Sequence, residues 1–294
     1  MIKIKTTLML LILCFLLLGC NVKEEELTIG MIPLRSEEKL VDDFEPIRRY
    51  LEEQLNIPIK FVVTDNYATL VEEMKNETID IGWFGAFSYV AADSQLDLTP
   101  LVLLERKEEG IYYQSLIITH IDTNIHTIED LKDTSFAFVD AGSTSGFILP
   151  YALLKSRDID YKQYFREFHY SGSHEEVAID VKNKHVDAGA ISSTQYNKLI
   201  KTGEIDVNDF RVIWKSEDIP GSLFVAKNTL DKKLQDEFIS ASKSIHDAQP
   251  KALKRFDDSI EKYIEVDKNI YHSIRNISTI LGKDELVEYF FNNK

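Results

Sequence analysis

The sequence predicts an α/β protein composed of two similar lobes, and three observations lead to this fold class. Short apolar runs that suit buried strands alternate with amphipathic segments that suit helices, an order typical of parallel α/β sheets. The same succession of elements occurs twice along the chain. The 294 residues are also enough for two domains of ordinary size.

Each copy of this succession contains three strands and three helices. In the first copy, strands are expected at 27–30, 59–63 and 79–85, with helices at about 37–55, at 67–74 and from 86 onward. In the second copy, strands are expected at 136–140, 166–170 and 186–191, with helices at 147–155, up to 182 and from 194 onward.

The spacing within the two copies agrees as well. Tyr67 lies 13 residues before Asp80, and His174 lies 13 residues before Asp187. A chance match of βαβ units is the alternative, because such units are common. Two true copies predict two lobes, each with loops at the carboxyl ends of its strands, where ligands of open α/β sheets bind.

The two lobes are expected to be interleaved along the chain. An apolar strand at 114–120 leaves the first lobe, and a strand at 221–226 returns to it. Two crossings form a hinge, and a cleft between hinged lobes can close on a ligand. Residues 231–293 have a helical pattern that suits packing on the first lobe. The expected division is 27–118 with 222–294 for lobe 1, and 119–221 for lobe 2.

The N-terminus has the features of an export signal. Two lysines precede an apolar run at 8–18, which is shorter than the roughly 20 residues that span a bilayer. The run ends in Leu-Leu-Gly-Cys, which resembles the lipobox of bacterial lipoproteins. We therefore expect a signal peptide at 1–19, a lipidated Cys20 and a polar tether at 20–26. This predicts an extracytoplasmic protein that is anchored to the bacterial cell membrane. An uncleaved anchor is the alternative.

The charge balance is strongly acidic. The chain has 34 basic and 49 acidic residues, a formal net charge of −15. Nucleic acids and anionic lipids are bound mainly by basic side chains, so neither is an expected partner. An anionic ligand would have to be attracted by local donors rather than by net charge.

A glycine-bracketed run of hydroxyls, Gly142 to Gly146, provides such donors. It follows an apolar strand and precedes a helix, and backbone N–H groups at a helix start favour anions. The side chains of Ser143, Thr144 and Ser145 add donors beside those amides. The pattern predicts a site for a tetrahedral oxyanion that needs no Lys or Arg. An ordinary helix cap is the alternative.

Several segments together resemble the phosphate/phosphite/phosphonate-binding proteins of ABC transporters. The resemblance implies a type II periplasmic-binding-protein fold, a hinged receptor that hands its ligand to a membrane permease. The motifs that carry it lie in the family's order and at similar spacing, at 81–90, 142–146, 171–174, 186–190 and 219–221.

The resemblance also implies roles for eight side chains. The phosphoryl or phosphonyl group would lie on Ser143, Thr144 and Ser145. Tyr67 would donate its hydroxyl from the opposite lobe, and His174 would reach the same oxygens. Tyr113 would line the cleft near the first crossing, and Trp83 and Phe84 would form its wall.

One departure from the family bears on the ligand. In aminophosphonate-binding relatives, acidic side chains follow the second-lobe strand and the Ile-Pro pair and neutralise the ligand amine. Here these stretches read Ser-Ser-Thr-Gln at 192–195 and Gly-Ser at 221–222. Glu217 and Asp218 precede the pair and are possible substitutes. The sequence favours phosphate, phosphite or a small alkylphosphonate.

Other function classes fit less well. A Ser-His-Asp hydrolase could be drawn from Ser143 or Ser145 with His174, but Gly-Ser-Thr-Ser-Gly is not the Gly-x-Ser-x-Gly elbow. The seven histidines are scattered without metal-ligand spacing. We therefore expect no enzyme, no metal and no cofactor, and a monomer. A receptor that reports to a membrane sensor stays open, because it would use the same lobes.

Overall fold

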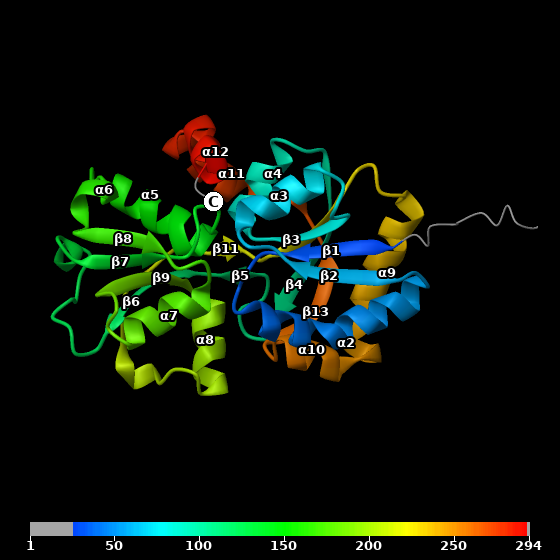
Figure 1. Ribbon diagram of the computed structural model, residues 1–294, viewed down its shortest axis with the longest axis horizontal. Coiled ribbons are helices and arrows are strands. Elements are labelled where there is room, and N and C mark those ends of the chain that lie inside the picture. The colour runs from blue at the N-terminus through cyan, green and yellow to red at the C-terminus, as the bar shows by residue number, and fades with distance from the viewer. Residues whose placement is uncertain (1–25, 293–294) are drawn as a thin grey trace, which may run out of the picture.

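The computed structural model describes residues 26–292 and consists of two α/β lobes that lie side by side (Figure 1). The expected signal peptide, Cys20 and all of the tether except Glu26 lie outside these residues. Within residues 26–292, no helix is both long enough and apolar enough to cross a membrane.

Lobe 1 is built on a six-stranded mixed sheet in the order β13-β4-β12-β3-β1-β2. Strand β1 pairs in parallel with β2 and β3, whereas β12, β4 and β13 are added in antiparallel fashion. The strands are β1 (Leu27–Met31), β2 (Ile59–Val63), β3 (Ile81–Phe84), β4 (Leu98–Arg106), β12 (Leu223–Lys227) and β13 (Ile260–Glu265).

Lobe 2 repeats this arrangement without its outermost strand. Its five-stranded sheet has the order β10-β6-β9-β7-β8, with β7 parallel to β8 and β9, and with β6 and β10 antiparallel. The strands are β6 (Ser115–His120), β7 (Ser135–Phe138), β8 (Glu167–Tyr170), β9 (Ala188–Ser192) and β10 (Phe210–Lys215).

Helices cover both sheets, and their buried faces follow the apolar periodicity of the sequence. In lobe 1, α2 buries Leu40, Phe44, Ile47, Leu51 and Leu55 along one face. Lobe 1 and the C-terminal region contain α2 (Glu37–Leu55), α3 (Tyr67–Lys75), α4 (Ala86–Asp93), α9 (Lys232–Ala248), α10 (Pro250–Phe256), α11 (His272–Leu281) and α12 (Lys283–Asn292). Lobe 2 contains α5 (Leu149–Lys155), α6 (Tyr161–Tyr164), α7 (His174–Lys182) and α8 (Ser193–Thr202).

The internal repeat is visible at the level of single hydrogen bonds. Asp80 accepts a bond of 2.8 Å from the backbone N–H of Thr28, which lies in β1. Asp187 accepts a bond of 2.8 Å from the backbone N–H of Ser135, which lies in β7. Both bonds join residues 52 apart, so the two copies fold alike. Each copy also has a nine-residue helix at the same place, α3 or α7.

Two short strands connect the lobes. Strand β5 (Tyr112–Tyr113) pairs in antiparallel fashion with β11 (Ile219–Pro220), and their labels lie between the lobes in Figure 1. The chain thus passes from lobe 1 to lobe 2 and back along adjacent strands, which confirms the predicted two-crossing hinge.

The C-terminal region differs from the uniformly helical pattern expected for 231–293. Strand β13 interrupts it and pairs with β4 at the edge of the lobe 1 sheet. Within it, Ile260 and Tyr263 are buried while Glu261 and Glu265 are exposed. A six-residue segment between helices gives a weak periodic signal, and its pairing with a strand over 150 residues earlier decides its conformation.

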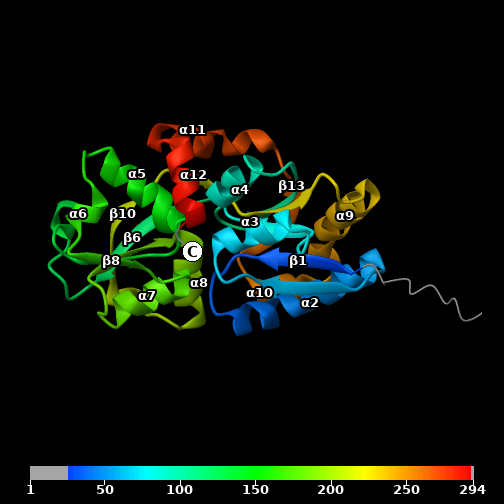
Figure 2. The ribbon, with the colours of Figure 1, turned by 45° about the horizontal axis from the view of Figure 1, so that its top comes forward.

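The last helix, α12, contacts both lobes. Phe290 is fully buried and packs edge-on against Phe87 of lobe 1, with ring centroids 6.0 Å apart. The hydroxyl of Tyr289 forms hydrogen bonds with those of Tyr161 (3.1 Å) and Tyr170 (2.8 Å) in lobe 2. Figure 2 shows α12 between α5 and α4. The sequence-based division gives 222–294 wholly to lobe 1, whereas this helix bridges the two.

Candidate functional site

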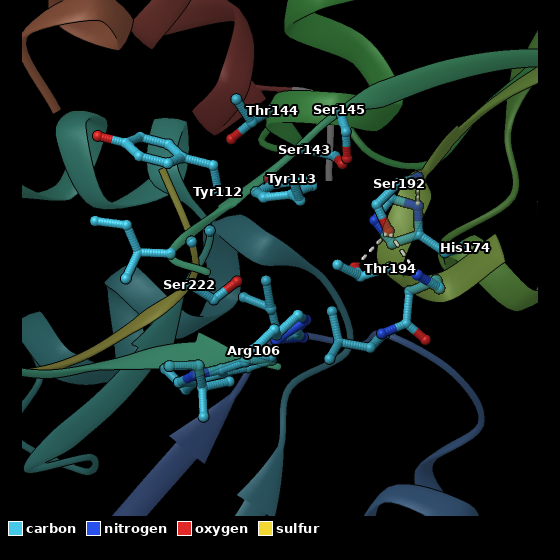
Figure 3. A pocket seen from close by; sticks show the side chains of 18 of the residues that line it. Arg106, Tyr112, Tyr113, Ser143, Thr144, Ser145, His174, Ser192, Thr194 and Ser222 are labelled. Carbon is cyan, nitrogen blue, oxygen red and sulfur yellow. Dashed lines mark hydrogen bonds between the residues drawn. The ribbon is translucent and has the colours of Figure 1, made fainter. Parts of the chain in front are cut away.

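A small cavity lies between the lobes, next to the two crossing strands (Figure 3). The cavity has a volume of about 40 Å³, which is more than the 10–15 Å³ that one water molecule needs. The space therefore suits a small polar ligand. Seven of the eight predicted site residues line it: Tyr67, Trp83, Tyr113, Ser143, Thr144, Ser145 and His174.

The hydroxyl run is arranged to donate hydrogen bonds. The Ser143 hydroxyl oxygen accepts a bond of 3.0 Å from the backbone N–H of Gly146, and that of Thr144 accepts one of 2.8 Å from Phe87. Because each oxygen already accepts, its own O–H remains available to donate. All three hydroxyl residues are almost completely buried, so little water competes for these donors.

The backbone of this run differs from the expected start of an α-helix. Residues Thr144–Ile148 form a π-helical turn, η2, which leads into the short helix α5. The N–H groups of Thr144 and Ser145 lie in its first turn, where a helix offers them no internal acceptor. These N–H groups are therefore directed away from the helix. The expected backbone donors are present, but in a π-helical turn rather than an α-helical one.

Two tyrosine hydroxyls meet the hydroxyl run from the other side. Burial raises the pKa of Tyr67 strongly, and the nearby Ser143 side chain opposes the rise. Burial also raises the pKa of Tyr113 to about 12, with the side chains of Ser145 and Thr144 opposing it. Both phenols are therefore neutral donors at physiological pH. Tyr67 belongs to lobe 1 and Tyr113 to a crossing strand.

His174 is held in one tautomer by the backbone. Its Nδ1 accepts a hydrogen bond of 3.2 Å from the N–H of Ser192. In the neutral ring, Nε2 therefore carries the proton and can donate it. Burial lowers the pKa of His174 to about 3, so the ring is neutral in the ligand-free protein. As the first residue of α7, capped by Ser173, it is positioned by the helix start.

A buried carboxylate supports the hydroxyl run from behind. Asp140 accepts a bond of 2.6 Å from the N–H of Gly142 and one of 3.4 Å from the N–H of Tyr67. Burial raises the pKa of Asp140 to about 6, and these two bonds oppose the rise. One side chain thus connects the loop of lobe 2 to the start of α3 in lobe 1.

The two aromatic residues predicted for the cleft wall lie in different places. Trp83 lines the cavity, whereas Phe84 is fully buried in the core and is not among the described residues that line it. Neighbouring side chains of a strand point to opposite faces, so β3 can present only one of the two to the cavity. The ring of Phe84 lies against Gly82 instead. The prediction for Phe84 was wrong for this reason.

The cavity also contains polar residues beyond the eight predicted for the site. Arg106 is the one Lys, Arg, Asp or Glu side chain among the described residues that line it. The prediction that the site needs no Lys or Arg overlooked this residue, which ends the unpredicted strand β4. Further hydrogen-bonding side chains come from the end of β9, from the start of α8 and from the residue that precedes β12, namely Ser192, Thr194, Gln195 and Ser222. Within residues 26–292, no group of three or more His, Cys, Asp or Glu side chains is placed to hold a metal.

The interleaved lobes, the two-strand hinge and the polar cavity between them define a two-lobed substrate-binding protein with the type II periplasmic-binding-protein fold. Residues 29–271 match the family described as "ABC transporter, phosphonate, periplasmic substrate-binding protein". The chain belongs to this family. It is therefore a binding protein of a transporter that acts outside the cytoplasm, and not an enzyme.

Individual relatives agree with this family. The chain is 27% identical to the "Phosphate-import protein PhnD" of Mycolicibacterium smegmatis, over 89% of this chain and 87% of that protein. A binding protein of an ABC phosphonate transporter from Pseudomonas aeruginosa has the same fold, with a TM-score of 0.81 and 24% identity over 87% and 86% of the chains. PhnD1 of Prochlorococcus marinus, solved with methylphosphonate, has a TM-score of 0.77 and 22% identity over 88% and 99%.

Proposed function

We propose that this protein captures a small phosphorus oxyanion (phosphate, phosphite or an alkylphosphonate) by closure of its two lobes and delivers it to the permease of an ABC transporter. In this proposal a lipid on Cys20 anchors the protein to the cell membrane. The ligand binds to Ser143, Thr144 and Ser145 of lobe 2, to Tyr67 of lobe 1, and to His174. Tyr113 and Trp83 complete the walls.

The single observation that carries the proposal is the convergence of neutral donors from both lobes on one small cavity. Three hydroxyls with outward-directed backbone N–H groups come from the loop of lobe 2, and two phenols meet them. Hydrogen bonds to a charged group contribute about 1.5–3 kcal/mol each. Several such bonds, offset by the cost of ordering and closure, suffice for micromolar or tighter binding.

Two further points support the ligand class. One relative is named a phosphate-import protein, and one solved relative was obtained with methylphosphonate. In addition, no Asp or Glu is found among the described residues that line the cavity. A ligand amine would therefore lack a counter-charge there, which favours phosphate, phosphite or methylphosphonate over an aminoalkylphosphonate.

The ligand proposal is tested by calorimetry with phosphate, phosphite, methylphosphonate, 2-aminoethylphosphonate and sulfate. Replacing Ser143, Thr144 and Ser145 together by Ala should weaken binding of the preferred oxyanion at least 100-fold, since about three charge-assisted bonds are lost. A matched control replaces three exposed hydroxyl residues by Ala, namely Ser156, Ser244 and Thr279. Equal affinity of the cavity variant and the control would show that the site is assigned wrongly.

Anchoring and delivery need separate measurements. Cys20→Ser should move the protein from the membrane fraction to the soluble fraction of cells, because the thiol that carries the lipid is lost. Recovery of the Cys20→Ser protein with the membrane would contradict the anchor. Loss of oxyanion uptake in cells that lack this protein, restored by the parent chain, would support transport over a purely sensory role.

A further inference from the structure

The cavity has two chemically different ends. Figure 3 shows Arg106 and Ser222 on the side opposite to Ser143, Thr144 and Ser145. A phosphoryl group on the hydroxyl run would therefore direct its remaining substituent toward Arg106. The identity of that substituent depends on what this end of the cavity can bind.

Arg106 has donor capacity that the protein does not use. Its side chain is 12% exposed, and Nη2 lies 3.3 Å from a carboxylate oxygen of Asp257. Nε forms an ion pair with Glu109 at 3.8 Å, a distance too long for a hydrogen bond, and buried Nε has no hydrogen-bond partner among the described residues. Because a guanidinium has five N–H donors, most of its fork remains free for a ligand.

A wider groove begins at the same residue. Arg106 and Thr194 line both the ligand cavity and a neighbouring groove of about 570 Å³. The groove contains more basic than acidic side chains, although the chain as a whole is acidic. The basic ones are Arg106, Lys107, Lys198, Lys201 and Lys254, and the acidic ones are Glu108, Glu109, Asp257 and Asp258.

Lys198 is a further cation that lines this groove. Lys198 is largely buried and donates a hydrogen bond to the backbone carbonyl of Phe256. Burial, together with the charge of nearby Arg35, lowers the pKa of Lys198 to about 8, and the carboxylates of Asp257, Asp43 and Glu204 oppose this shift. A second anionic group placed beside Arg106 would be stabilised by both cations, whereas an ammonium group would be repelled.

We propose that Arg106 forms a second anion subsite, so that the protein prefers phosphonates with a carboxylate on the substituent over those with an amine. This inference rests on the proposed function, because it assumes that the phosphonyl group lies on the hydroxyl run. The carboxylate accepts N–H bonds from the guanidinium fork, and longer substituents extend toward the groove past Thr194.

The test compares ligands that share the phosphonyl group and differ at the other end. Calorimetry of the purified protein uses methylphosphonate, phosphonoacetate, 3-phosphonopropionate and 2-aminoethylphosphonate. The parent should bind at least one of the two carboxylates at least 10-fold more tightly than 2-aminoethylphosphonate. Equal or tighter binding of the amine would overturn the subsite.

Variants then assign the preference to Arg106. Arg106→Gln should weaken binding of the preferred carboxylate at least 10-fold and change methylphosphonate affinity less than 3-fold. If the single variant is unstable, a double variant, Arg106→Gln with Asp257→Asn, replaces it because it removes both partners of the buried pair. The double variant should show the same two changes, a loss of carboxylate affinity of at least 10-fold and a change in methylphosphonate affinity of less than 3-fold. Arg157→Gln, which removes a distant exposed arginine of lobe 2, is the control for net charge and should leave all affinities unchanged.

The outcomes separate this inference from the proposed function. If methylphosphonate, phosphate and phosphite all fail to bind the parent, the proposed function fails. If methylphosphonate binds and Arg106→Gln weakens all four ligands equally, the oxyanion site stands and the second subsite is rejected. A selective loss of carboxylate binding supports the subsite.

Discussion

The hydroxyl oxygen of Thr144 accepts a hydrogen bond of 2.8 Å from the backbone N–H of Phe87. Thr144 belongs to the hydroxyl run of lobe 2, and Phe87 lies in the first turn of α4 in lobe 1. The bond therefore joins the two lobes at the site itself. It also orients the threonine O–H for donation, so the proposed binding and the proposed closure depend on the same side chain.

Thr144→Val should weaken oxyanion binding about 10- to 100-fold, because the side chain keeps its shape but loses the acceptor for Phe87 and the donor for the ligand. Calorimetry with the preferred oxyanion measures this change. Thr144→Ser keeps the hydroxyl and should stay within about 3-fold of the parent. Unchanged affinity of the valine variant would contradict the role given to this bond.

His174 should make the ligand-free protein less stable as the pH falls. Its folded-state pKa of about 3 is below the ordinary value of 6.5, so the unfolded chain binds a proton that the folded protein does not. The contribution of His174 to the free energy of unfolding is fully present above pH 6.5 and is lost progressively as the pH falls toward 3. At pH 5 the loss is on the order of 2 kcal/mol.

The measurement is urea unfolding at pH 7 and pH 5 for the parent and for His174→Asn. The asparagine oxygen can still accept the N–H bond of Ser192, but the residue does not titrate. The variant should therefore lose less stability between the two pH values. Asp140, with a pKa raised to about 6, acts in the opposite direction in both proteins and cancels in the comparison. An identical pH dependence would show that His174 is not responsible.

Gly142→Ala should destabilise the protein by about 1–3 kcal/mol, the usual cost of overpacking. An added Cβ would lie 2.9 Å from the Cβ of Tyr67 and closer still to the ring of Phe290. It would thus push apart α3, the hydroxyl run and α12. Gly85→Ala is the control, since its new Cβ would meet no atom nearer than 3.6 Å. Urea unfolding should show the larger loss for Gly142→Ala, and equal losses would contradict this packing.

Lys39→Gln should weaken ligand binding about 2- to 5-fold at low salt, through closure rather than through the cavity. The Lys39 ammonium lies 2.6 Å from Glu175 and 2.7 Å from Glu204, both in lobe 2. Because the lysine side chain is 46% exposed, the ion pairs are screened by solvent, and the difference should vanish at high salt. Lys233→Gln, which breaks an ion pair inside α9, should leave affinity unchanged. An effect independent of salt would argue against an ionic contribution to closure.

The repeated lobes could be predicted from the sequence because their signals are local. Strand and helix periodicity is read over a few residues, and the equal spacings from Tyr67 to Asp80 and from His174 to Asp187 fixed corresponding positions. The structure gives the physical reason for that register. In each lobe the aspartate accepts a hydrogen bond from the first strand of its own copy.

Most of the predicted site residues come together for a similar reason. They follow the carboxyl ends of strands or lie next to a crossing, and parallel strands place such residues at one edge of a sheet. Phe84 is the exception, because strand alternation directs Trp83 to the cavity and Phe84 to the core. This error could have been avoided from the period of a strand alone.

The sequence by itself determined the fold class, the two copies and the hydroxyl run, since each depends on residues close together in the chain. Only the tertiary structure decided that Arg106 ends β4 at the cavity, that 260–265 forms a strand, and that α12 bridges the lobes. These features depend on which distant elements pack together. The contacts that stabilise these features join segments that are far apart in the sequence, so no local sequence pattern predicts them.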